Sequence, residues 1–370
     1  MLFFVYVSSF FPESSAKELE GLANVSIVDK SLNVAIVESD ADLCSIVRKK
    51  KPVFIYGVFP LRTKGRISKG DYLGSIYRQM LKAMRAGKVG RDETVFLECY
   101  DINNRTRYSA KDIEVSLGQR LNSDGYKADI IDPTAFVYAV LLNGVCYAGT
   151  SEFDYEWQRR LNPLRRYMGT RKVSRAEFKI REAFEEFGIS GNGIAIDLGA
   201  APGGWSLFLH KRGYKVIAVD PAKLDYAAMK SAGARVITLP PGGDVAKSIK
   251  RCDVLHIKAG FDDALRMIPK TCATLIADDM NLGPLASAAA VLEFVPTLTP
   301  HASLVLTVKC MSRNAPKFMR EAKHALSGSF EVKSIKALPS NRQEVTLFAS
   351  RSGSVKASKT AHDWKKCGVP

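Results

Sequence analysis

Four charged residues in the second half of the chain could carry out proton transfer. They are Lys179, Asp279, Lys309 and Glu344. Each alone is more often a solvated surface charge. Asp279 follows the apolar run 274–277 and Lys309 follows the run 303–308, so in a parallel sheet both fall at neighbouring carboxyl ends, where such sheets bind ligands. Ionisable side chains gathered there could exchange protons with a bound ligand.

A turn of small residues marks a candidate cofactor site in the same region. It follows the apolar segment 193–198 and reads Asp197-Leu198-Gly199-Ala200-Ala201-Pro202-Gly203-Gly204-Trp205-Ser206. Its glycines let the backbone approach a ligand closely at the start of a helix. The spacing is not that of GxGxxG, and no P-loop lysine follows. Asp220 ends the next apolar run, about 20 residues on, where an acid can hold ribose hydroxyls. A nucleoside cofactor is favoured over a generic glycine-rich turn.

The elements that must position these residues alternate between strand and helix from about residue 174. This pattern predicts an α/β fold, a Rossmann-like doubly wound sheet with its ligand at the carboxyl ends of the strands. The last two strands should be antiparallel, because residues 339–343 are too few for a crossover helix. The expected strands are 193–198, 214–219, 235–239, 253–257, 274–277, 303–308, 332–338 and 345–349.

The first 152 residues predict two small α+β modules. Residues 1–60 read β-α-β-β-α-β, which is typical of a ferredoxin-like unit, with residues 2–10 as its first strand and Ser14 or Ser15 as a helix N-cap. Residues 61–152 read as a second module, with strands at 127–131 and 134–142 and a hairpin turn at Asn143-Gly144.

The formal charge of +16 favours a polyanionic partner. Residues 153–173 form a basic linker, and residues 351–370 form a basic tail expected to be flexible. A solvated linker is one interpretation, but the density of arginine favours a phosphate-contacting surface at least as strongly. The RNA-contacting candidates are Arg159, Arg160, Arg165, Arg166, Arg171, Lys172 and Arg175. The 7 cysteines are scattered without metal-binding spacing, and no apolar run of about 18 residues suggests a membrane span. We therefore expect a cytoplasmic protein with reduced thiols and without a metal.

The segments 174–179, 197–206 and 279–280, with Lys309 and Glu344, resemble in order and spacing the FtsJ-like (RrmJ) 2′-O-methyltransferases and their Lys-Asp-Lys-Glu tetrad. This resemblance covers about residues 174–350. The preceding part looks like a ferredoxin-like unit followed by a THUMP RNA-binding domain, whose most similar piece is 132–149. This domain order resembles the large-subunit ribosomal RNA methyltransferases of the M type, which modify a cytidine ribose.

The resemblance implies S-adenosylmethionine as cofactor and an RNA ribose hydroxyl as methyl acceptor. Lys309 would be the base, and we expect burial and the nearby Lys179 charge to lower its pKa. Asp279 would orient Lys309 close to the methyl group, while Glu344 and Lys179 would fix the hydroxyl. The implied cofactor contacts are Ser174, Asp197, Gly199, Ala201, Pro202, Gly203, Gly204, Trp205, Asp220 and Asp279.

One family feature is missing from the sequence. The family has an acidic residue near adenine, and Ala259 stands at the best-matching position, with Asp244 and Asp262 as nearby candidates. The stretch between Asp220 and Asp279 is also longer than the resemblance leads us to expect. The adenine contact therefore stays unassigned.

Two other functions remain open. The chain could bind RNA with an inactive methyltransferase fold, although the intact tetrad argues against this. It could also be a THUMP-type base methyltransferase, but residues 278–281 read Asp-Asp-Met-Asn and not Asn/Asp-Pro-Pro-Tyr. Cytosine C5 transfer needs a cysteine nucleophile, and Cys310 and Cys272 are more simply explained as buried thiols. Ribosomal RNA is the favoured partner and transfer RNA the alternative, with neither DNA nor membrane expected. The modified nucleotide and the oligomeric state are not determined by the sequence.

Overall fold

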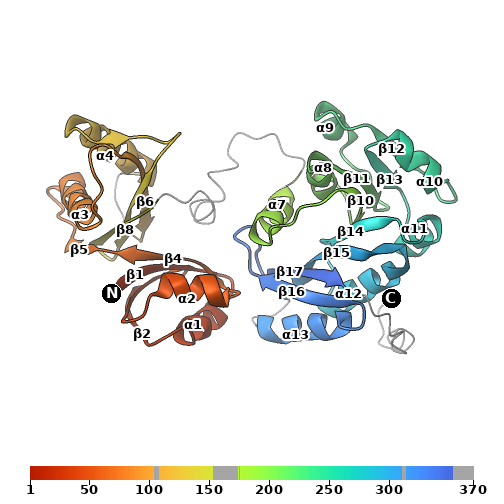
Figure 1. Cartoon of the computed structure of the whole chain (residues 1–370), viewed down its shortest axis with the longest axis horizontal. Helices are drawn as coiled ribbons and strands as arrows, with labels where there is room; N and C mark the ends of the chain where they lie inside the picture. The colour runs from red at the N-terminus through yellow and green to blue at the C-terminus, as the bar shows by residue number, and fades with distance from the viewer. Residues whose placement is uncertain (104–107, 153–173, 175, 311–313, 353–370) are drawn as a thin grey trace. The chain divides into compact units, whose positions relative to one another are not determined.

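The computed structural model describes residues 1–103, 108–152, 174, 176–310 and 314–352, and the chain divides into two compact units, 1–167 and 168–370 (Figure 1). The predicted RNA contacts Arg159, Arg160, Arg165, Arg166, Arg171, Lys172 and Arg175, and the predicted flexible tail from residue 353 on, lie outside the described residues. None of the described helices is long and apolar enough to span a bilayer.

The first unit begins with the predicted β-α-β-β-α-β module. Its sheet has the strand order β2-β3-β1-β4 with antiparallel pairs, so the ferredoxin-like topology is confirmed. The predicted N-cap at Ser14 or Ser15 is wrong, because α1 starts earlier, at Pro12, whose fixed φ suits the first helical turn. The elements are β1 (Leu2–Val7), α1 (Pro12–Glu20), β2 (Val25–Lys30), β3 (Val34–Ser39), α2 (Leu43–Lys50) and β4 (Ile55–Leu61).

A mixed sheet of order β5-β9-β8-β6-β7 follows in the same unit. The predicted hairpin at Asn143-Gly144 joins β8 to β9, with both turn residues at positive φ. The predicted strand 127–131 is shorter than expected, and Ile130 and Ile131 are exposed beyond its end. The elements are β5 (Thr63–Arg66), α3 (Tyr72–Ala86), β6 (Thr94–Ile102), α4 (Ala110–Ser123), β7 (Lys127–Ala128), β8 (Ala135–Leu142) and β9 (Val145–Glu152).

These two sheets share an apolar core. Phe4, Ile36 and Phe59 of the first sheet pack in one buried cluster with Phe136 and Tyr138 of the second. Helices α1 and α2 cover the opposite face of the first sheet, where a separate buried cluster lies. Strands β1, β3 and β4 therefore contribute apolar side chains to two cores, which explains why they are apolar on both faces, whereas Ile27 and Val28 of β2 are exposed.

The second unit contains the predicted doubly wound sheet, of order β12-β13-β11-β10-β14-β15-β17-β16. Its first six strands pair in parallel, and β17 pairs antiparallel with both β15 and β16, so the predicted antiparallel end is confirmed. The strands are β10 (Gly193–Leu198), β11 (Tyr214–Val219), β12 (Val236–Leu239), β13 (Val254–Ile257), β14 (Ala273–Asp278), β15 (Leu298–Lys309), β16 (Phe330–Lys336) and β17 (Glu344–Arg351).

Helices connect these strands and cover the sheet (Figure 1). A buried cluster on one face joins Ile180 and Phe184 of α7 and Phe208 of α8 to alternate residues of the central strands, including Ala195 and Leu275. This packing holds α7 against the sheet. The helices are α7 (Glu177–Glu186), α8 (Gly204–Lys211), α9 (Tyr226–Ser231), α10 (Val245–Ser248), η1 (Ile249–Arg251), α11 (Phe261–Met267), α12 (Pro284–Glu293), η2 (Val295–Thr297) and α13 (Ala315–Leu326).

Candidate active site

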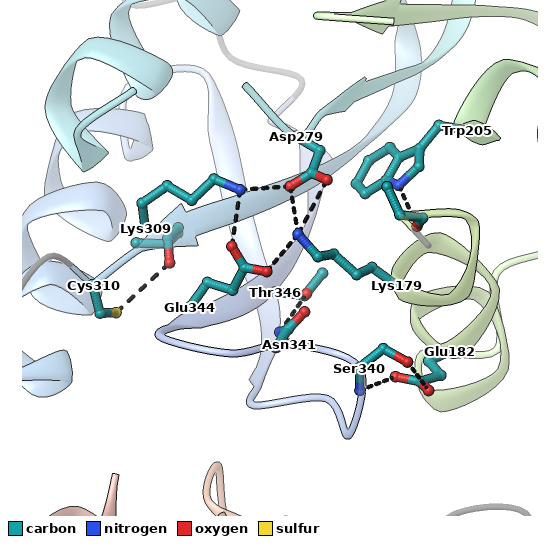
Figure 2. A network of polar contacts seen from close by, with 12 residues as sticks. Lys179, Glu182, Trp205, Asp279, Lys309, Cys310, Ser340, Asn341, Glu344 and Thr346 are labelled. Carbon is teal, nitrogen blue, oxygen red and sulfur yellow. Dashed lines mark hydrogen bonds and ion pairs between the residues drawn. The ribbon is translucent and has the colours of Figure 1, made fainter. Parts of the chain in front are cut away.

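The four residues singled out for proton chemistry meet in one closed ring of ion pairs (Figure 2). Lys309 Nζ lies 2.7 Å from Asp279 Oδ1 and 2.9 Å from Glu344 Oε2. Lys179 Nζ lies 3.2 Å from both oxygens of Asp279 and also contacts Glu344 Oε1. Each lysine thus pairs with both carboxylates, and the four side chains are only 9–17% exposed. Such burial needs this mutual compensation of charge.

Strand pairing brings three members of the ring together. Asp279 directly follows β14, and Lys309 is the last residue of the neighbouring parallel strand β15. Glu344 is the first residue of β17 and stands directly opposite Lys309 in the antiparallel register. Opposed residues of antiparallel strands have adjacent side chains. Lys179 arrives from α7, which packs on the same face of the sheet.

The ring raises the pKa of Lys309 above its ordinary value. Burial works against the charged amine, but the two adjacent carboxylates of Asp279 and Glu344 outweigh it. The expected depression of this pKa is therefore wrong for this arrangement, because two anions counter the charge of Lys179. Conversely, burial favours the neutral form of Glu344, yet Lys179 and Lys309 hold the pKa of its carboxyl below the usual range. Lys309 and Glu344 are therefore both charged at neutral pH.

The small-residue turn runs along the carboxyl ends of β10 and β11. Gly199 and Gly203 have φ values of +71° and +110°, which L side chains rarely adopt. Asp220, directly after β11, accepts a hydrogen bond from the Ala201 amide at 3.0 Å. Asp197 is buried and accepts a bond from Ser206 Oγ at 2.6 Å, so this carboxylate braces the start of α8. Burial is the main reason that its pKa rises to about 7.

Ser174 and Trp205 connect this turn to α7. Ser174 lies against Gly204, where a β-carbon would collide with Ser174 Oγ. That hydroxyl is buried without a hydrogen-bond partner among the described residues. Trp205 Nε1 donates to the Ala176 carbonyl at 2.8 Å, next to the start of α7 (Figure 2). The glycine turn therefore packs directly against the start of α7, the helix that carries Lys179, and the Ser174 hydroxyl is available to a ligand.

The strand order bears on the missing adenine contact. The strand next to β11 is β13, and β12 lies outside it, so the long stretch after Asp220 contains an edge strand. Ala259, two residues after β13, is buried, and Asp262 lies in the first turn of α11. Asp244 caps α10 through a 2.9 Å bond to the Lys247 amide. Asp262 is therefore the acid nearer in the chain to the strand beside Asp220.

Two arrangements were missed in the sequence. His256, buried on β13, interacts through Nε2 with the Asp220 carbonyl at 2.9 Å and through Nδ1 with Tyr226 Oη at 2.7 Å. Since the carbonyl only accepts, Nε2 carries the proton and Tyr226 donates to Nδ1. Asp278, beside Asp279, is buried, which raises its pKa to about 7. Neither residue belongs to a recognisable local pattern, so no sequence signal distinguished them from ordinary strand residues.

Comparison with known proteins identifies this unit. The family model "FtsJ-like methyltransferase" matches residues 172–348, a range that contains the ring, the glycine turn and Asp220. Residues 172–348 are an FtsJ-like methyltransferase domain. The resemblance inferred from the tetrad and the glycine turn is thereby confirmed.

Curated proteins that match part of this chain are named as ribosomal RNA methyltransferases. The chain is 31% identical over 157 residues to ribosomal RNA large subunit methyltransferase M of Actinobacillus succinogenes, covering 37% of this chain and 41% of the relative. It is 34% identical over 120 residues to ribosomal RNA large subunit methyltransferase E of Acidiphilium cryptum, covering 31% and 50%. The chain therefore spans about two fifths to one half of the length of these relatives.

Among solved structures, TrmN from Thermus thermophilus is similar with a TM-score of 0.38 and 13% identity, covering 95% of this chain and 100% of that chain.

The residues of the FtsJ-like domain fit S-adenosylmethionine. The Ser174 hydroxyl offers a free hydrogen-bonding group beside the turn, and the positive-φ glycines keep side chains away from its backbone. Asp220 supplies an acid after the second strand, in the position where ribose hydroxyls are held in such folds. The ring adds two carboxylates and two ammonium groups, which can exchange protons with a bound ligand. Among the described residues no group of side chains could hold a metal ion.

Proposed function

We propose that the chain transfers a methyl group from S-adenosylmethionine to a ribose 2′-hydroxyl of RNA, with ribosomal RNA as the substrate class. The observation that carries this proposal is the closed ring of Lys179, Asp279, Lys309 and Glu344, located at the carboxyl ends of β14 and β15. A site of two lysines and two carboxylates handles a hydroxyl and its proton without a nucleophilic side chain or a metal.

The proposed division of roles follows from the contacts. The bound cofactor supplies an electrophilic methyl group. Lys309 and Glu344 position the acceptor hydroxyl, and Lys309 takes its proton when the amine is neutral. Asp279 contacts both lysines and holds them in place, while Lys179 compensates the charge of the two carboxylates. Because the ring favours the charged form of Lys309, contact with substrate has to weaken one of its two ion pairs.

We propose that the cofactor contacts are Ser174, the turn from Asp197 to Trp205, and Asp220. The buried hydroxyl of Ser174 and the open backbone of the turn support this. Asp262 is our proposed adenine contact, since it follows β13, the strand next to β11. A change of affinity for the cofactor in Asp262→Ala but not in Asp244→Ala, measured calorimetrically, tests this choice.

RNA binding is proposed for the first unit and for the arginine-rich segment 153–173. Residues 61–152 would act as the THUMP-like domain. In support, α3 presents Arg78, Lys82 and Arg85 on its exposed side at spacings of four and three residues, which places them on one helix face. We call these three residues the α3 stripe. Cations in such a row suit successive backbone phosphates.

Base methylation is the second class considered. A C5 mechanism requires a reactive thiolate, but burial raises the pKa of Cys310 to about 12, and its Sγ donates to the Val308 carbonyl at 3.6 Å. Burial also raises the pKa of Cys272. Both observations disfavour a cysteine nucleophile. The described cysteines are free thiols, which supports our proposal of a cytoplasmic location.

The decisive experiment maps the product. The protein is incubated with total RNA and isotopically labelled S-adenosylmethionine, and the RNA is then digested and analysed by mass spectrometry. We expect the label on ribose, in dinucleotides that resist cleavage, because a 2′-O-methyl group removes the nucleophile for hydrolysis of the adjoining phosphodiester. Label on a base in fully cleaved mononucleotides would overturn the proposal. The same reaction with Lys309→Met is the negative control.

A further inference from the structure

Glu182 makes a second connection between α7 and the loop that leads to Glu344. Its carboxylate accepts two hydrogen bonds from Ser340, at 2.8 Å from the backbone amide and 2.6 Å from Oγ (Figure 2). Glu182 is 8% exposed. Burying a carboxylate is unfavourable unless hydrogen bonds replace its lost hydration. An apolar side chain of the same volume would be enough for packing. The acid at this position therefore contributes through its hydrogen bonds to Ser340.

The geometry of α7 links this contact to the ring. Glu182 follows Lys179 by three residues, so both side chains project from one helix face. Lys179 contacts Glu344 at the start of β17, and Glu182 contacts Ser340, four residues earlier, in the loop that leads to this strand. Helix α7 is thus joined to the segment 340–344 by two contacts, and only the Lys179–Glu344 contact belongs to the ring.

The loop itself is fixed on its other side. Asn341 is 2% exposed and donates through Nδ2 to Thr346 Oγ1 at 3.0 Å. The Gln343 carbonyl accepts a bond from the Cys310 amide at 2.8 Å. These contacts anchor the loop to β15 and β17, and therefore set the position of Glu344. Neither of these two bonds involves α7. The position of Lys179 relative to Glu344 therefore depends on the contacts that hold α7 against this loop.

We infer that Glu182 is a positioning residue: with Ser340 it forms a clamp that fixes the Lys179 ammonium against Glu344 and Asp279. This inference rests on the proposed function for its kinetic consequence, but its geometric part concerns Lys179 alone. Trp205 anchors the start of α7 through the Ala176 carbonyl, and the Glu182–Ser340 clamp anchors it one turn beyond Lys179. A lysine held from both sides loses little freedom when it acts.

Four variants separate positioning from simple stability. Glu182→Ala removes both bonds of the clamp, whereas Glu182→Gln keeps an acceptor for the Ser340 amide and a donor for its Oγ. Ser340→Ala keeps the amide bond and loses only the hydroxyl. The matched control is Glu186→Gln, an acid on the same helix whose carboxylate lies 3.7 Å from Lys336 Nζ, far along the helix from the ring.

The kinetic expectation is a loss of turnover. Glu182→Ala should lower kcat between about 10-fold and 100-fold, the order expected for a misplaced catalytic group, with KM for S-adenosylmethionine nearly unchanged. Glu182→Gln should restore most of the rate, Ser340→Ala should be intermediate, and Glu186→Gln should match the wild type. In a Lys179→Met background, Glu182→Ala should cause little further loss, because contacting residues are not additive. An equal loss in both backgrounds, or none in either, would overturn the inference.

A second measurement does not depend on methyl transfer. Competitive acetylation, read out by peptide mass spectrometry, reports the reactivity of each lysine. Lys179 should react faster in Glu182→Ala than in the wild type or in Glu186→Gln, while Lys333, an exposed lysine of β16, should react equally in all. Unchanged Lys179 reactivity would overturn the clamp whatever the enzyme does. If the wild type methylates no ribose while Lys179 responds as expected, the proposed function fails and the clamp stands.

Discussion

Lys309 and Glu344 stand directly opposite each other in the antiparallel pair β15–β17, and their charged groups are 2.9 Å apart. The contact is made by the last residue of one strand and the first of the other. A shift of one residue in this register would turn Glu344 to the other face of the sheet. The geometry of the ring therefore depends on the pairing of two strands as much as on the residues themselves.

Replacing Lys309 should separate catalysis from binding. We expect Lys309→Met to lower the methylation rate by at least about 100-fold, the usual contribution of a group that transfers a proton. RNA affinity should stay within twofold or so, because base-independent phosphate contacts elsewhere supply most of it. Rates are measured with labelled cofactor, and affinity by filter binding.

The matched control for this change is Lys333→Met, since Lys333 is an exposed lysine on β16 that pairs with Glu331 at 2.6 Å. Thermal unfolding of both variants checks that they fold. A variant of Lys309 that loses RNA binding in parallel with activity would favour an RNA-binding protein over an enzyme.

The pH dependence should follow the raised pKa of Lys309. Only the neutral amine accepts a proton, so the rate should rise with pH, about tenfold per unit below the pKa, up to the limit of stability. Glu344→Gln removes one of the carboxylates that raise this pKa, so its profile should be displaced to lower pH even where its maximal rate is lower. Rate–pH profiles of kcat for wild type and variant test this. An identical midpoint in both would exclude Lys309 as the titrating base.

Asp278 should make folding stability depend on pH in the opposite sense to an ordinary surface acid. Its pKa is raised to about 7 in the folded state, chiefly by burial, against an ordinary value of 3.8. The folded state then binds more protons than the unfolded state, so stability present below pH 3.8 is lost as pH rises through about 7. Asp278→Asn should raise the melting temperature more at pH 8 than at pH 5.

The comparison for Asp278 is Asp253, where the hydrogen bond to Arg235 lowers the pKa. Asp253→Asn should lose stability at neutral pH and little near pH 3, because the ionised form is the stabilised one. Differential scanning fluorimetry across this range is sufficient. A gain in Asp278→Asn that is the same at all pH values would mean that its carboxyl does not titrate in this window.

Alanine at Gly203 should impair cofactor binding. At φ +110° the new side chain is strained, and its β-carbon would collide with Met229 Cε beneath the turn. We expect a loss of about 1–3 kcal/mol in stability and a clear loss of S-adenosylmethionine affinity, measured by calorimetry. Gly213→Ala is the matched control, because Gly213 has φ +94° with nothing within 4 Å of a β-carbon and precedes β11, away from the site. It should lose stability but retain affinity.

Neutralising the α3 stripe should weaken RNA binding in a salt-dependent way. Each lost phosphate contact reduces the slope of log affinity against log salt by about 0.7–0.9. Replacing Arg78, Lys82 and Arg85 together by Gln should therefore lower the slope by about 2–3 units. The control is the same change at the exposed cations of α13, Lys317, Arg320 and Lys323. Equal effects of both triple variants would indicate non-specific charge attraction.

Much of the site could be predicted from the sequence because its signals are local. The glycine turn, the acid after the second strand and the charged strand ends each occupy short segments, and strand order then brings them together. The pKa of Lys309 could not be predicted, since it depends on how many carboxylates contact one amine. The buried position of Glu182 could not be predicted for a similar reason. On an amphipathic helix an acid looks solvated until the loop carrying Ser340 covers it.

The position of β12 shows a different limit. The sequence gives the order of the strands along the chain, but not which of β12 and β13 lies next to β11 in the sheet. In the structure β13 pairs with both β11 and β12, so β12 is the edge strand. The choice decides which acid follows the strand beside Asp220. Long-range pairing of this kind is fixed by the whole sheet and has no local signature.

The shared core of the two N-terminal sheets restricts how this protein can be dissected. A shortened chain starting at residue 61 would lack the first sheet and would expose side chains that are now buried, namely Phe136, Tyr138, Val140 and Leu142. An exposed apolar surface of this kind promotes aggregation. The first 152 residues must therefore be kept or removed together in any truncation study, and the ferredoxin-like module is a structural half of its neighbour and not a detachable appendage.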